Sequence, residues 1–416
     1  MAGLLGSLAA LVVGSAIGVF DQKTFLSEDI ASDYLILAIL LGNLLIVAVA
    51  SEIGIFQFIS IKLLKATKGD PDKLYWALGG LTFIFSAFVS TIPAILIVGA
   101  LTIVACNELQ YNPKNYILME IVITNTGGIT TSISAITNLI IAIPFKISFV
   151  RFLIIALPLS IILFFVSMLM MKRICPIPET DDAEWRITKI NEFDEWSFVK
   201  NKNKFMITSF VFVFTLVLLL FSDILHMEIA VIFVGGGIIM LYTSGKDIEK
   251  VMAKLDWPLL AFFMSLFVLI KSLEIVGLMD LLSEWILHIL GTNPYIGAII
   301  ILVFSSLLSG ILDNVVLAIS LTPVLLDIAA KNPHLNIGLL VWALIIGTNL
   351  GGGLTPIGAP PCVLGLGILY RETGIKVGWG EFFMSVGKVT IVRIVISALY
   401  LIILGLLVSS STLVGI

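Results

Sequence analysis

Long apolar runs recur along the whole chain. Each is about as long as the roughly 20 residues that a bilayer-spanning helix needs. Of its 416 residues, 59% are hydrophobic and only 12% are charged, and the mean hydropathy is +1.12. A soluble domain is nearer half apolar and a quarter charged. The sequence therefore predicts an all-α polytopic membrane protein.

The composition argues against several classes of function. A net charge of −4 does not suit a polyanionic partner such as nucleic acid. Cys106, Cys175 and Cys362 are scattered and show no metal-binding spacing. The sequence has no Walker A loop for ATP, and its few histidines and cysteines suit neither a nucleophile–base pair nor a metal cluster. We therefore expect no cofactor, no catalytic residues and no nucleic-acid partner.

The apolar runs divide the chain into four parts. Residues 1–33 contain an N-terminal transmembrane helix at 2–20, which lacks the basic start of a signal peptide. Residues 34–172 form a first unit, residues 173–257 a cytoplasmic linker with two connecting helices, and residues 258–416 a second unit. The ordinary spans of the last three parts are predicted at 34–51, 150–172, 205–222, 227–243, 258–273 and 387–409.

Two further runs, 75–106 and 295–330, are too long for one crossing and too short for two. A helix of roughly 32 residues reaches about 48 Å, whereas one crossing needs about 30 Å and two need about 40 residues. We expect each run to be a re-entrant hairpin of two half-helices. The tips are predicted at Ser90–Pro93, where the proline breaks the helix, and at Asp313–Asn314.

Two broken helices are predicted at 116–145 and 336–369, where polar, glycine-rich clusters interrupt the apolar sequence. TNTGGITTSISAITN (124–138) and TNLGGGLTPIGAPPC (348–362) agree at seven positions with an offset of 224. The matched pairs are Thr124/Thr348, Asn125/Asn349, Gly127/Gly351, Gly128/Gly352, Thr131/Thr355, Ile133/Ile357 and Ala135/Ala359. Each unit thus carries a span, an amphipathic stretch, a hairpin, a broken helix and a span, in that order.

The direction of each crossing follows from the number of spans that precede it, because each hairpin returns to the side of the membrane from which it entered. The span at 258–273 then runs opposite to that at 34–51, which predicts inverted repeats, as in secondary transporters. One face collects 18 of the 24 Lys and Arg residues, and the positive-inside rule makes that face cytoplasmic. We expect about nine crossings and two hairpins in the inner or plasma membrane, with the N-terminus cytoplasmic and the C-terminus external.

Ionisable side chains inside apolar runs indicate function, because they are costly at membrane depth. Asp313, in LLSGILDNVVLAISLTP, is predicted to couple transport to a proton or to sodium. Glu120, about one helical turn before the first glycine cluster, is a second candidate for coupling. Lys271 and Arg393 are interpreted as residues that snorkel or form pairs rather than bind substrate.

The glycine clusters are predicted to form the substrate and ion site with the hairpin tips. Backbone carbonyls released there can coordinate a cation, and half-helix N-termini can hold an anion. The alternative is that small residues only allow close helix packing. The predicted site comprises Ser90, Thr91, Asn125, Thr126, Gly127, Gly128, Thr130, Thr131, Asp313, Asn314, Asn349, Gly351, Gly352 and Thr355. Sodium is expected at Asp313, Asn314 and Asn349.

At these motifs the sequence resembles the ion transporter superfamily, and within it the ArsB/NhaD-type permeases, which include arsenite permeases, NhaD sodium/proton antiporters and relatives of the P protein. The likeness covers most of the chain. The segments that carry it are SEIGIFQFISIKLLKATKG (51–69), MEIVITNTGGITTSISAITNLI (119–140), LDWPLLAFFMSLFVLIKSLEIVGLMDLL (255–282) and GTNLGGGLTPIGAPPCVLGLGILYRETGIKVGWGEFF (347–383). Relatives of the P protein carry an Asp–Asn pair at the first hairpin tip, where this chain has Ser90–Thr91.

Sequence and resemblance together predict a secondary active transporter that works by alternating access. Cation (sodium)/proton coupling is the first expectation. Two other functions stay open, namely efflux of arsenite or another small oxyacid, and sodium-coupled import of a carboxylate. The expected partners are a small inorganic ion or small anion and the lipid bilayer. The family that the chain resembles includes both homodimers and monomers.

Overall fold

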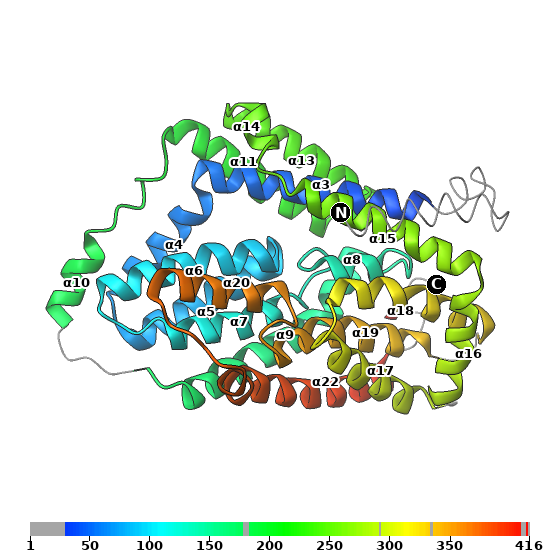
Figure 1. Ribbon diagram of the computed structural model, residues 1–416. Coiled ribbons are helices and arrows are strands. Elements are labelled where there is room, and N and C mark those ends of the chain that lie inside the picture. Colours follow the sequence, from blue (N-terminus) through cyan, green and yellow to red (C-terminus); the bar gives the residue numbers. More distant parts are fainter. Residues whose placement is uncertain (1–29, 178–182, 291–292, 333–335, 409–412, 415–416) are drawn as a thin grey trace.

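All of the regular structure that the computed structural model describes is helical, and no strand occurs within residues 30–177, 183–290, 293–332, 336–408 and 413–414 (Figure 1). Within these ranges, eight helices are long and apolar enough to cross a membrane, or nine if the bent pair Leu278–Ile289 and Pro294–Ser309 counts as one span. The prediction of an all-α polytopic membrane protein is confirmed. The span predicted at 2–20 lies outside the described residues.

The helices form two layers (Figure 1). The first layer, along the top of the figure, consists of α3 (Ile30–Ile53), α11 (Lys202–Leu220), α12 (Ser222–Leu225), α13 (Ile229–Ser244), α14 (Ile248–Met252) and α15 (Trp257–Ile275). Within it, α3 packs on α13 and α15, and α13 packs on α11. These helices bury apolar side chains such as Val49, Phe233 and Phe263 and expose others, such as Phe210, Val231 and Met264.

The second layer contains the predicted hairpins and broken helices of both units. From the first unit come α5 (Pro71–Phe88), α6 (Thr91–Glu108), α7 (Lys114–Gly127), α8 (Ile136–Ala142) and α9 (Phe149–Ile174). From the second come α17 (Pro294–Ser309), α18 (Asn314–Lys331), α19 (Ile337–Gly351), η1 (Gly352–Leu354), α20 (Pro360–Thr373), α21 (Trp379–Phe382), η2 (Phe383–Gly387) and α22 (Lys388–Leu407). Two helices join the layers at opposite ends, α4 (Ile55–Ala66) and α16 (Leu278–Leu290) (Figure 1).

Both long runs break near the predicted tips. α5 ends at Phe88, Ser90 is extended, and α6 starts at Thr91. The prediction that Pro93 breaks the helix is wrong. Pro93 lies in the first turn of α6, where its missing N–H is not needed. In the second unit Asp313 caps the start of α18 by accepting a hydrogen bond from the backbone N–H of Val315, at 2.8 Å.

The sequence repeat extends to the hydrogen bonds that hold each hairpin on its broken helix. The Ser86 hydroxyl donates to the Thr124 carbonyl at 2.6 Å, and the Ser309 hydroxyl donates to the Thr348 carbonyl at 2.7 Å. A second equivalent pair of hydrogen bonds measures 2.5 Å in each unit: the Thr131 hydroxyl donates to the Ala87 carbonyl, and the Thr355 hydroxyl donates to the Gly310 carbonyl. Both units therefore use the same local contacts.

Close backbone approach explains one pair of matched glycines. A Cβ atom on Gly127 would lie 2.8 Å from the Phe83 carbonyl oxygen, and one on Gly351 would lie 2.1 Å from the Ser306 carbonyl oxygen. The two units also exchange contacts, because α6 packs on α20 and α18 packs on α8. The inverted orientation of the two units in the membrane stays a prediction.

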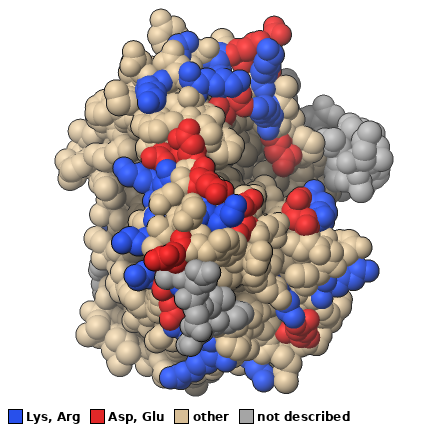
Figure 2. Space-filling view, turned by 90° about the vertical axis from the view of Figure 1, so that its left-hand side faces the viewer, with Lys and Arg blue, Asp and Glu red and all other residues tan. Residues whose placement is uncertain are grey.

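Charged residues gather at the end of the molecule that carries α4 and α10 (Ala183–Asn191), which faces the viewer in Figure 2. This end holds the linker that the positive-inside rule assigns to the cytoplasm. The linker docks on α4, where the Lys65 ammonium pairs with the Glu195 carboxylate and Trp196 packs on Phe58. The hydrogen bond from Lys65 lowers the pKa of Glu195.

We expect a cysteine placed at Glu192 to react with a membrane-impermeant maleimide only from the cytoplasm, and one placed at Glu228 only from outside. Both positions are exposed, and the three native cysteines are buried, so the parent protein supplies an unlabelled background. The measurement is labelling of intact cells compared with inverted vesicles. Reaction of both positions from the same side would contradict the predicted topology.

Candidate functional site

The two broken helices meet in the middle of the second layer. The end of α7 packs on α19 and on η1, and α8 packs on α19. Asn349 donates from Nδ2 to Oδ1 of Asn138 at 2.7 Å, which links the two units directly. Asn138 in turn donates to the carbonyl oxygens of Gly128 and Thr131, both at 2.8 Å. We call this meeting point, formed by residues 125–138 and 349–362, the junction.

Asn125 and Asn349 occupy equivalent positions of the repeat and both face the junction. Each retains 4% exposure, whereas the neighbouring Thr124, Thr126 and Thr348 are fully buried. The amide nitrogens are used as donors, from Asn349 to Asn138 and Ile345 O and from Asn125 to Cys362 Sγ at 3.8 Å. The two side-chain carbonyl oxygens thus remain to accept from, or to coordinate, a ligand.

Two helix ends at the junction favour a cation at these oxygens. α7 and α19 both end here, and the C-terminal end of a helix carries partial negative charge. Within the described ranges, no group of three or more His, Cys, Asp or Glu residues could hold a metal ion. A cation bound at the junction would therefore rely on neutral oxygens, which suits sodium better than a transition metal.

Arg393 is the one cation that the described structure places at the junction, and its side chain is 0% exposed. Its Nη1 donates to the Val122 carbonyl oxygen at 2.8 Å and to the Thr126 hydroxyl at 2.9 Å, and its Nη2 donates to the Thr390 hydroxyl at 2.5 Å. Nε has no partner. No ion pair with a described carboxylate reaches this guanidinium, so Arg393 neither snorkels nor forms the pair that we had expected.

Arg393 was missed because it was interpreted as a residue that snorkels or pairs rather than binds substrate. Its position inside the apolar run 387–409 was the available signal, since an arginine in the middle of a span is costly. Asn138 was missed because its equivalent in the second unit is Cys362, so the pair breaks the repeat.

The first hairpin tip and the rest of the two glycine clusters lie at or beside the junction. Ser90 and Thr91 begin α6, and the Thr91 N–H donates to the Ser134 carbonyl. Thr130 is buried and its hydroxyl has no partner, while Gly352 accepts a hydrogen bond from Cys362 Sγ at 3.4 Å. These contacts make the first hairpin tip and both glycine clusters parts of one packed region.

Asp313 and Asn314 lie at the tip of the second hairpin, and no described hydrogen bond joins them to Asn349. The Asp313 side chain is exposed and caps α18, and Oδ1 of the half-buried Asn314 has no partner. The tip itself contacts the second glycine cluster, because Gly310 lies against Gly358. Glu120 is elsewhere, fully buried between α6 and α7, where its carboxylate accepts a hydrogen bond from Thr102.

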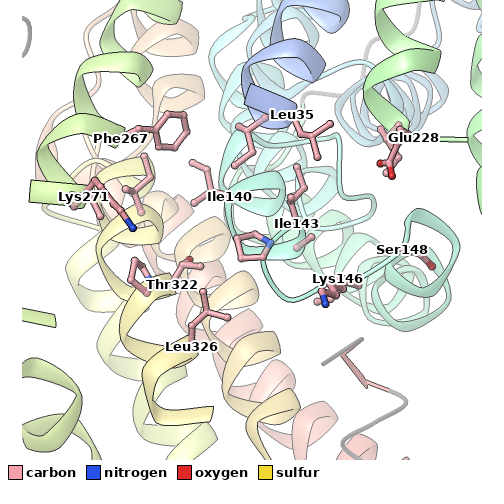
Figure 3. A pocket seen from close by; sticks show the side chains of 18 of the residues that line it. Leu35, Ile140, Ile143, Lys146, Ser148, Glu228, Phe267, Lys271, Thr322 and Leu326 are labelled. Atoms are coloured by element: carbon pink, nitrogen blue, oxygen red, sulfur yellow. The ribbon is translucent and has the colours of Figure 1, made fainter. Parts of the chain in front are cut away.

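A cavity of about 1250 Å³ opens between the two layers beside the junction (Figure 3). Phe267 and Lys271 of α15, Ile140 of α8 and Thr322 of α18 are among the residues that line it. The cavity thus reaches α8 two residues beyond Asn138. Its ionisable lining residues are Lys146, Asp223, His226, Glu228, Lys271, Glu274, Asp280 and Asp327.

The chain has relatives that align with nearly its whole length, and some of them are described as transporters. An uncharacterized transporter of Mycobacterium tuberculosis is 27% identical over 96% of this chain and 92% of its own length. The 46 kDa membrane protein of Mycobacterium leprae is 26% identical over 94% of this chain and 91% of its own. The mouse P protein is 25% identical over 98% of this chain, which spans only 58% of that longer protein.

The fold has a counterpart among solved structures. The Alcanivorax borkumensis YdaH transporter, described as having an unusual topology, aligns with a TM-score of 0.56 over 88% of this chain and 86% of its own, at 14% identity. A family model described as citrate transporter, CitMHS, matches residues 1–347 and 272–413. The resemblance to the ion transporter superfamily is therefore confirmed. The chain is a membrane transporter, not an enzyme, and it belongs to the citrate transporter family CitMHS.

Proposed function

We propose that this transporter moves a small carboxylate anion together with a coupling cation, sodium or a proton, by alternating access at the junction. This proposal corresponds to carboxylate transport, one of the three functions that the sequence left open. The observation that carries the proposal is Arg393, a fully buried guanidinium without a carboxylate partner among the described residues.

A guanidinium cannot lose its proton in a protein, so burial does not neutralise Arg393. A buried charge without a counter-charge is strongly unfavourable, and a bound anion would supply that counter-charge. Arginine also suits a carboxylate geometrically, because its planar fork of N–H groups matches the two oxygens. Gly353 lies directly against this group, since a Cβ atom there would be 3.0 Å from Nη2 and 2.6 Å from the Thr390 hydroxyl oxygen.

When sodium is the coupling cation, it is proposed to bind beside the anion, at the carbonyl oxygens of Asn125 and Asn349. The C-terminal ends of α7 and α19 favour positive charge at this place. Asn125 also connects the two subsites, because its Nδ2 lies 3.5 Å from the position of a Cβ on Gly353. Opposite charges bound side by side stabilise each other, which provides the energetic link that coupled transport requires.

The other two functions fit the junction less well. A cation/proton antiporter would gain nothing from a permanent positive charge at its centre. Arsenite and similar weak oxyacids are neutral near pH 7 and do not need a buried cation either. Cys362 places one thiol at the junction, and it already donates to the Gly352 carbonyl.

Uptake into proteoliposomes tests the proposal. We expect radiolabelled citrate to accumulate when a sodium or proton gradient is imposed, and other di- and tricarboxylates to compete. Flux of sodium or lithium against protons without any carboxylate would support antiport instead. Efflux that follows arsenite and ignores carboxylates would support the oxyacid permease.

A second sodium ion, apart from the one at Asn125 and Asn349, is proposed to bind at the second hairpin tip, held by Asp313 with Asn314 beside it. Asp313→Asn is expected to keep the cap of α18, since asparagine caps helices as well as aspartate does, and to reduce sodium-stimulated uptake about tenfold. Asp313→Ala should lower stability by about 1 kcal/mol in addition. Uptake against sodium concentration and thermal unfolding measure the two effects. Wild-type sodium dependence in Asp313→Asn would leave Asp313 with a capping role alone.

A further inference from the structure

Glu120 is a buried carboxyl group that the proposed anion site does not use. It lies in α7, five residues and about 7.5 Å along the helix axis before Asn125. One carboxylate oxygen, Oε1, accepts a hydrogen bond from the Thr102 hydroxyl of α6. The other oxygen, Oε2, is buried and has no partner in the described structure.

The part of the structure described around Glu120 contains no compensating charge. Oε2 points toward Gly99 of α6 and lies 3.6 Å from the position that a Cβ atom on Gly99 would take. The side chains of Ile117 and Ile368 also lie within 4 Å of that position. Cys106 of α6 is the titratable neighbour. From α20 and α22, Cys362 and Arg393 reach α7 further along, at Asn125 and at Val122 and Thr126.

The remaining neighbours of α7 do not change this picture. α19 and η2 contain no charged residue. The charges of α5 and α9 lie in their end turns, where Asp72 pairs with Lys172. Lys114, at the start of α7, pairs with Glu381 of α21. Within the described residues, no cation is thus placed to neutralise Glu120, and a proton is the remaining counter-charge.

The internal repeat shows that the fold does not need this polar pair. With the offsets of 223 for the hairpins and 224 for the broken helices, Thr102 corresponds to Leu325 and Glu120 to Leu344. Both leucines are buried, in α18 and α19, which pack on each other as α6 and α7 do. Two leucines therefore suffice for packing, and the polar pair in the first unit calls for another explanation.

We infer that Glu120 is a proton-binding site of the transporter, which holds a proton on Oε2 while α6, α7 and α20 enclose it and exchanges it when these helices separate. The inference rests on the proposed function and names the proton as a coupling ion. In the binding step a carboxylate takes up one proton and becomes a neutral carboxyl group, and no other bond changes. Enclosure keeps the proton from leaking between the two sides of the membrane.

Infrared spectroscopy of the purified full-length protein tests the protonation directly. We expect wild type at neutral pH to show the C=O band of a buried protonated carboxyl group, and Glu120→Gln to lack it. Glu108→Gln, which removes an exposed carboxylate at the end of α6, is the matched control and should retain the band. A band that is absent from wild type, or unchanged in Glu120→Gln, would overturn the inference, whether or not citrate is transported.

Proton coupling is tested separately by citrate uptake under an imposed pH gradient. The pH gradient should stimulate wild type and Glu108→Gln equally, and stimulation should fall at least fivefold in Glu120→Gln. The double variant Thr102→Leu with Glu120→Leu copies the second unit, so it should fold and show the same loss. Full stimulation in Glu120→Gln would overturn the inference. If wild type takes up no carboxylate, the proposed function fails, and the infrared result still decides whether Glu120 holds a proton.

Discussion

Arg393→Gln is expected to reduce gradient-driven citrate uptake at least 100-fold. If the anion pairs with Arg393, the variant loses one partner of a buried charge pair, which costs about 3–5 kcal/mol. Arg393→Lys keeps the charge and loses the planar fork, so we expect an intermediate loss of about tenfold. Initial uptake rates at saturating coupling cation measure both effects.

Arg371→Gln provides the matched control, because Arg371 is exposed near the end of α20, far along that helix from the junction. It should transport like wild type. Arg393→Gln should still be inserted and monodisperse, since removal of an unpaired buried charge relieves an unfavourable burial. Wild-type uptake by Arg393→Gln would mean that the arginine serves only its hydrogen bonds to Val122, Thr126 and Thr390, and the carboxylate proposal would fall.

The sequence predicted those features of the fold that depend on local signals. Hydropathy located the spans that fall within the described residues, and polar or glycine-rich interruptions located the breaks near Ser90, Gly128, Asp313 and Gly352. Such signals work because each break needs freed backbone groups at one point of an otherwise apolar helix. They fail by a few residues where two explanations compete, as at Pro93, which fits the first turn of α6 as well as a break.

The site was less predictable because its contacts join distant segments. Asn349 and Asn138 are 211 residues apart, and Arg393 and Val122 are 271 apart. A polar residue in an apolar run indicates a cost without indicating the partner that offsets it. Asp313 illustrates the difficulty, since its sequence context resembles that of Arg393, yet Asp313 is exposed at a helix cap and Arg393 is fully buried.

Gly128→Leu is expected to abolish transport, at least 100-fold, in a protein that still folds and inserts. Gly128 has φ of −60°, which any residue adopts, so the backbone does not require glycine here. The limited space requires glycine, because a Cβ atom on residue 128 would lie 2.9 Å from Thr91 Cγ2 and 3.4 Å from Asn349 Oδ1. A leucine would therefore occupy the volume beside the oxygen that is proposed to bind the cation.

Gly367→Leu is the control for a leucine introduced at a helical glycine of the same layer. Gly367 lies in α20, and no atom lies within 4 Å of a Cβ placed there, so transport should continue. Gly128→Ala should be intermediate, since a methyl group displaces Thr91 before it reaches Asn349. Uptake and sodium affinity report on the site, and gel filtration reports on the fold. Normal uptake by Gly128→Leu would show that the glycine clusters serve helix packing, and the cation subsite would then have to lie away from Asn349.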